Sequence, residues 1–148
     1  MFADFLRRLT APAPERLPDP DARLALGALL VRVARVDGQY SQAEVARIER
    51  ILALRHDLGP DDARRLREDA EVLESEAPDT VRFTRAIKDA VAYEDREAVI
   101  EALWCVALSD GQRDAEESAM LRLVANLLGI SDRDSALARQ RVEARQTP

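Results

Sequence analysis

The sequence predicts an all-α fold of about seven to eight helices, and three observations support this prediction. Ala, Leu, Arg and Glu dominate the composition, whereas aromatic residues make up only 4% of it, and this balance favours helix over sheet. Apolar residues recur at helical spacing along most of the chain. One helix-turn-helix pattern also occurs twice, at a separation of 73 positions, which is the distance from Asp37 to Asp110.

A chain of 148 residues that is 47% apolar and 34% charged has the size and composition of one globular domain. Its net charge of -6 argues against a nucleic-acid partner, because phosphate backbones attract basic surfaces. The sequence has no run of the ~20 apolar residues that a membrane span needs, and its first residues do not resemble a signal peptide. A cytoplasmic location is therefore expected.

Residues 1–20 are predicted to form an N-terminal amphipathic helix followed by a proline-rich linker. Four apolar residues share one face of the short helix, namely Phe2, Phe5, Leu6 and Leu9. The linker is expected to be extended because it contains Pro12, Pro14, Pro18 and Pro20. Docking on this or a neighbouring domain is favoured over membrane binding, since so short a helix with two arginines binds lipid weakly. Use of the arm in a homodimer contact stays open.

Residues 21–145 are predicted to form a single domain, which begins with two helices joined by a tight turn. Nearly every position of 22–36 is apolar, so the first of these helices should be buried on most sides. The Asp37-Gly38 turn ends it. Ser41 and Glu44 have the spacing of a capping box, which starts the second helix. So short a turn makes the two helices neighbours.

Two further helices are expected before this pattern returns. One begins at or just after Pro60 and stops near Pro78, and the next carries Val81, Phe83, Ile87 and Val91. The second unit then has an apolar helix over 94–109, an Asp110-Gly111 turn and a helix capped by Asp114 with Glu117 three residues later. Gly129 is expected to end that helix, and Ser131 to begin a last, arginine-rich one.

The two turns share polar residues as well as apolar ones. Asp-Gly-Gln, with a glutamate six residues after the glycine, occurs in both copies. Gly38 and Gly111 suit a left-handed helix cap, and capping boxes explain the glutamates. An aspartate at a helix C-terminus opposes the helix dipole, so Asp37 and Asp110 call for a partner.

The same spacing resembles the second half of a calcium-binding EF-hand loop. A complete EF-hand is excluded because apolar or basic residues stand where its first two oxygen ligands belong, namely Val33 and Arg35 in one copy and Val106 and Leu108 in the other. A composite site remains if the two units pack about a pseudo-two-fold axis. Its ligands would be Asp37, Glu44, Asp110 and Glu117. Oxygen ligands without Cys or His favour Ca, Mg or Mn, and the alternative is that these residues only cap helices.

Residues 34–48 and 107–121, with the motif Leu127-Leu128-Gly129-Ile130-Ser131, resemble the paired motifs of TerB-like domains. The resemblance covers about residues 21–130. It implies a TerB-like bundle associated with bacterial tellurite resistance and stress responses, and a relation to the N-terminal region of a membrane-anchored J-domain co-chaperone. It also implies metal binding at the same four acidic positions. Tyr40 and Arg113 differ at equivalent turn positions, so the two turns need not bind alike.

No motif indicates catalysis, and the chain is predicted not to be an enzyme. The only histidine, His56, is expected to have a surface role at a helix end, and the only cysteine, Cys105, to be a buried structural thiol. The predicted function is a non-catalytic stress-response module that binds a divalent cation. The alternative is a metal-free helical interaction or scaffold domain with an unidentified protein partner, which the co-chaperone resemblance would place at a membrane.

Overall fold

The computed structural model describes residues 19–36, 38–76, 80–108 and 115–146. Within these ranges the chain forms seven helices and no strand, which confirms the all-α prediction. The helices are α2 (Asp19–Arg35), α3 (Gln42–His56), α4 (Pro60–Glu76), α5 (Thr80–Ala90), α6 (Tyr93–Ala107), α7 (Ala115–Leu127) and α8 (Asp132–Gln146). The predicted helix over Phe2–Leu9 and most of its linker lie outside the described residues.

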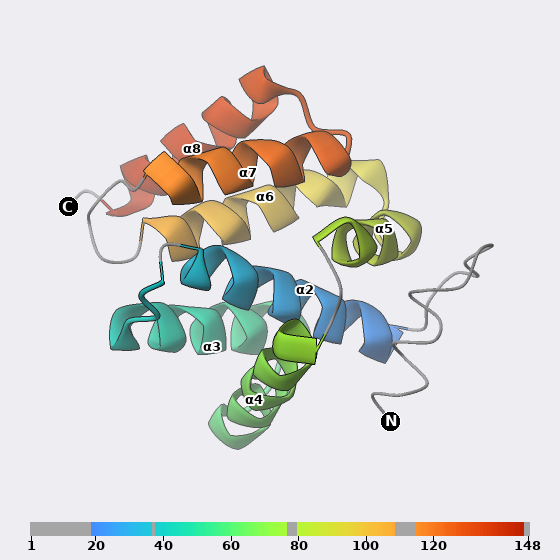
Figure 1. Cartoon of the computed structure of the whole chain (residues 1–148), viewed down its shortest axis with the longest axis vertical. Helices are drawn as coiled ribbons and strands as arrows, with labels where there is room; N and C mark the ends of the chain where they lie inside the picture. Colours follow the sequence, from blue (N-terminus) through green and yellow to red (C-terminus); the bar gives the residue numbers. More distant parts are fainter. Residues whose placement is uncertain (1–18, 37, 77–79, 109–114, 147–148) are drawn as a thin grey trace.

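Helices α2 and α6 form the centre of the bundle. They lie side by side, with α3 and α4 packed on α2 and with α7 and α8 packed on α6 (Figure 1). Both central helices are apolar around most of their circumference, so their side chains supply much of the core. The leucines Leu29, Leu30 and Leu103 have no exposed surface. The two repeated units therefore share one core through their first helices.

Local sequence signals explain most of the helix ends. Gly129 has a φ of +79° after α7, the left-handed conformation expected of a helix cap. Ser131 caps α8, because its Oγ accepts a hydrogen bond of 3.1 Å from the Asp134 N–H. Helix α2 begins at Asp19, inside the segment that was expected to be linker. Pro20 is compatible with this start, since a helix's first turn needs no N–H from it.

Helices α2 and α4 approach each other closely at Gly27. A Cβ atom added to this glycine would lie 2.9 Å from the Cβ of Ala70, closer than two such atoms normally come. The missing side chain of Gly27 and the small one of Ala70 thus let the two backbones pack together.

One buried hydrogen bond joins α6 to α8. The indole Nε1 of Trp104 donates to the Oγ of Ser135 at 3.2 Å, which satisfies a polar group that would otherwise be buried without a partner.

Among the described helices, none is long and apolar enough to cross a membrane.

Candidate functional site

The helices that lead into the two Asp-Gly turns end at the same side of the molecule. Helices α2 and α6 are in contact and run in the same direction, and their C-terminal ends lie together on the left of Figure 1. Helices α3 and α7 also begin on this side. The repeat therefore brings the helix ends that flank its two turns to one end of the bundle, as a composite site requires.

Gly38 adopts the backbone conformation that its turn requires. Its φ is +81°, and its N–H donates a hydrogen bond of 2.9 Å to the carbonyl oxygen of Arg35. A Cβ at this position would meet no atom within 4 Å, so the glycine is needed for its left-handed conformation and not for space. Gly38 thus has the left-handed conformation that commonly ends a helix.

Glu44 forms the capping box that its spacing with Ser41 predicts. Its Oε1 accepts hydrogen bonds from the N–H of Ser41 at 3.0 Å and from the hydroxyl of Ser41 at 3.2 Å. The Glu44 N–H donates to the Ser41 Oγ at 3.1 Å in return. Glu44 is only 2% exposed. One of its two carboxylate oxygens is thus already used in starting α3.

The side chains of the other predicted site residues are not among those that the structure describes. Asp37, Asp110 and Gly111 lie outside the described residues, and Glu117 belongs to α7 with a side chain that is not described. In the parts of the chain that are described, no three His, Cys, Asp or Glu side chains come close enough to hold a metal ion. The convergence of the four acidic side chains therefore remains a prediction.

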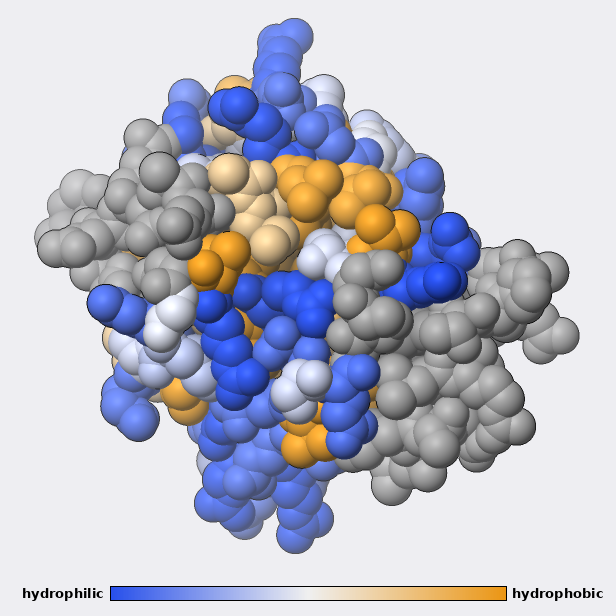
Figure 2. All heavy atoms as spheres, in the orientation of Figure 1, coloured by the Kyte–Doolittle hydropathy of each residue, from blue (hydrophilic) through white to orange (hydrophobic). Residues whose placement is uncertain are grey.

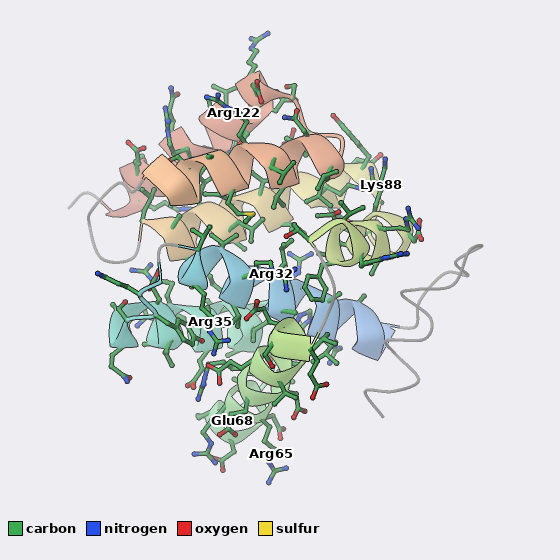
Figure 3. All side chains as sticks on the ribbon, viewed as in Figure 1. Arg32, Arg35, Arg65, Glu68, Lys88 and Arg122 are labelled. Atoms are coloured by element: carbon green, nitrogen blue, oxygen red, sulfur yellow. The ribbon has the colours of Figure 1, made fainter. Side chains whose placement is uncertain are left out.

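A carboxylate on α4 neutralises two arginines from the last turns of α2. Glu74 Oε2 lies 3.2 Å from Nε of Arg32, and its Oε1 lies 2.9 Å from Nη1 of Arg35. Arg32 also donates to the main-chain oxygen of Glu74 at 2.9 Å. Figure 3 shows Arg32 and Arg35 on α2, beside the end of α4. Sequence reasoning missed this cluster because its members are separated by about forty residues.

Tyr40 ties the first turn to α4. Its hydroxyl donates a 2.7 Å hydrogen bond to Oε2 of Glu71, and Arg67 donates to the same oxygen at 2.7 Å and to Glu49 at 2.6 Å. Burial, followed by the hydrogen bond to Glu71, raises the pKa of Tyr40 well above its usual value of 10. Tyr40 therefore stays protonated and donating throughout the physiological range. Its counterpart in the repeat is Arg113, so this anchor belongs to the first turn.

A comparison with models of protein families identifies the family of the chain. A family model described as tellurite resistance protein TerB matches residues 23–140. The chain belongs to the TerB family. The TerB match includes both helix-turn-helix units and ends within α8. Neither the curated proteins nor the solved structures contain a match to the chain. The relation to a J-domain co-chaperone remains a prediction, because the match extends to TerB alone.

Two residues of the TerB domain differ from the environments predicted for them. His56 lies in the last turn of α3, as expected, but its ring is half-buried and its Nε2 is enclosed. His56 therefore occupies the predicted helix end but is only partly exposed there. Cys105 is half-buried against the core, and burial raises the pKa of its thiol above the usual value. The local apolar sequence overstated its burial, because the charges of Arg145 and Arg47 act on the thiol from α8 and α3.

Proposed function

We propose that this TerB chain is a non-catalytic, tellurite-resistance-like stress-response module that holds one divalent cation between its two Asp-Gly turns. The observation that carries the proposal is the parallel contact of α2 and α6, whose C-terminal ends lie together (Figure 1). A duplicated acidic corner with its copies at opposite ends of the bundle could bind two ions or none, but it could not share one.

The chemistry of the turns supports a hard cation. Asp37 and Asp110 follow the ends of helices, where the partial negative charge of the dipole makes a carboxylate unfavourable without a cation. Carboxylate oxygens without thiol or imidazole ligands suit Ca, Mg or Mn. The ion would link the α2–α3 corner to the α6–α7 corner. A free tellurite oxyanion would be repelled by the same carboxylates.

Calorimetric titration of the full chain with Ca²⁺, Mg²⁺ and Mn²⁺ tests this proposal. We expect saturable binding of one ion per chain, and we expect Asp37→Asn with Asp110→Asn to weaken it at least about tenfold, since each substitution removes a charged ligand. The variant Glu44→Gln removes a charge but keeps an acceptor for the capping box, so it should weaken binding while leaving α3 intact.

The matched control is Glu68→Gln with Asp69→Asn on α4, which neutralises two exposed acids away from the turns. This double variant should bind the ion as the native chain does. Equal binding by the Asp37 and Asp110 double variant, or no saturable binding by the native chain, would refute the cation site.

A metal-free interaction domain is the second candidate, and the surface of α7 favours it. Leu123 is 49% exposed, and Met120 and Leu127 lie on the same side of the helix, partly exposed. Figure 2 shows apolar side chains gathered over α7. An apolar surface of this kind is typical of a protein-protein contact. The calorimetric titration separates the two candidates, because this one predicts no ion uptake.

A further inference from the structure

A second candidate binding site lies at the end of α2 that is remote from the turns. A cavity of about 190 Å³ opens there between the start of α2, the end of α3, the end of α5 and the first half of α6. Its apolar wall comes from four aliphatic side chains, namely Leu26, Ile87, Val91 and Val99. Three basic groups also line it, and these are Arg23, Arg55 and His56. An apolar cavity that is also lined by two arginines is suited to an amphipathic anion.

The internal repeat supplies a comparison for Arg23. Its counterpart, 73 positions later, is Arg96. Arg96 donates to the main-chain oxygens of Val91 at 3.1 Å and Lys88 at 2.9 Å, and a longer bond of 3.5 Å reaches Leu128. Arg23 makes no hydrogen bond or ion pair with any part of the chain that is described. The N–H groups of Arg96 are thus hydrogen-bonded to carbonyl oxygens. Those of Arg23, at the same position in the other copy, lie beside a cavity without a partner in the described structure.

The other two basic groups are also without a contacting acid. The Nε2 of His56 is enclosed and has no hydrogen-bond partner in the described structure, which costs stability until a partner is supplied. Arg55 lies near Asp95 at the start of α6, whose charge acts on it, but no ion pair within 4.0 Å joins the two among the described residues. Among the described side chains that line the cavity there are thus two arginines and no carboxylate.

We propose that this cavity binds a small organic anion, a carboxylate attached to a short branched aliphatic group. The carboxylate would accept hydrogen bonds from Arg23 and Arg55 beside the ring of His56, while the aliphatic part would lie against Leu26 and Val99. The cavity is far larger than the space that a single water molecule needs, so it has room for several non-hydrogen atoms. A branched acid such as 3-methylbutanoate has this size.

Binding at this site should be coupled to proton uptake by His56. Burial, with the charges of Arg23 and Arg55, lowers the pKa of His56 to about 4, so the ring is neutral at pH 7. Among the described side chains, those that line the cavity from the α5 side are the aliphatic residues Ile87 and Val91. A carboxylate bound beside the ring favours the imidazolium and raises this pKa. The affinity for the anion should therefore increase as the pH falls from 7 towards 5.

Titration of the full chain with 3-methylbutanoate, followed by calorimetry and by amide chemical shifts, tests the proposal. We expect saturable binding, with 3-methylbutanamide and acetate each at least about tenfold weaker because one lacks the charge and the other the aliphatic group. At pH 5, calorimetry in two buffers of different ionisation enthalpy should show proton uptake. A tripeptide ending in valine separates two sources of the carboxylate: tighter binding than the free acid assigns the site to a peptide C-terminus, and weaker binding assigns it to a small acid.

Three variants locate the site. Arg23→Gln should weaken binding about tenfold by removing one charge, and Ala22→Leu should abolish it by filling the cavity while keeping every charge. Arg50→Gln, an exposed arginine on α3 away from the cavity, should bind as the native chain does. Equal affinity for acid and amide, unchanged affinity in Arg23→Gln, or no binding at millimolar acid would overturn the proposal. None of these outcomes depends on the cation site.

Discussion

Leu30→Ala and Leu103→Ala should each lower the free energy of unfolding by about 3 to 4 kcal/mol. The two leucines occupy equivalent positions of the repeat, on α2 and α6, and neither has any exposed surface. Truncating either one removes apolar contacts and leaves a cavity in the core that both units share. Similar losses are expected because the two helices have equivalent places in the bundle. Equilibrium unfolding in urea, followed by far-ultraviolet circular dichroism, measures them.

Leu54→Ala is the control for this pair. Leu54 is 78% exposed on α3, so its truncation should change the stability by less than about 0.5 kcal/mol. A loss of less than about 1 kcal/mol in either core variant would contradict a single shared core. It would indicate that one of the two units packs more loosely than the structure describes.

Glu74→Ala should destabilise the fold by about 2 kcal/mol. Removing this carboxylate leaves two arginines of α2 without their acid, and Arg32 is only 16% exposed. Full burial would make the loss larger, but the 39% exposure of Arg35 lets water replace part of the interaction. High salt should lower the free energy of unfolding of the native chain more than that of the variant, because only the native chain has these ion pairs to screen. The difference in stability between the two proteins should therefore shrink.

Glu68→Ala provides the matched comparison for Glu74→Ala. Glu68 lies on the same helix, is exposed, and is labelled beside Arg65 in Figure 3. Its removal should change the stability by less than about 0.5 kcal/mol. Equal effects of the two substitutions would show that Glu74 contributes no more than a surface acid, which the distances in the structure contradict.

The sequence predicted the helices well because their ends carry local signals. Ser41 with Glu44, Ser131 and Gly129 each act within a few residues of the helix end that they set. The start of α2 was placed too late because prolines at 18 and 20 suggested a linker, whereas a proline in the first turn is compatible with a helix. Spacing alone does not distinguish these two uses of proline.

Interactions between helices could not be predicted in the same way. Arg32 and Arg35 meet Glu74 because α2 and α4 pack together, with Gly27 close to Ala70, and no local pattern encodes that packing. The partial burial of His56 has the same origin, since residues of α2 and α6 lie around it. The candidate cation site lies between these cases. Its capping glutamate and its left-handed Gly38 were predictable, and the convergence of its acids depends on tertiary packing.

Paramagnetic broadening by Mn²⁺ tests that convergence most directly. In the amide spectrum of the native chain, substoichiometric Mn²⁺ should broaden the signals of Gly38 and Gly111 together, because one ion would lie within reach of both turns. An excess of Mg²⁺ should restore both signals. Broadening at one turn alone, or equal broadening over all exposed acids, would contradict a shared ion and leave the TerB chain as a helical scaffold with two separate capped corners.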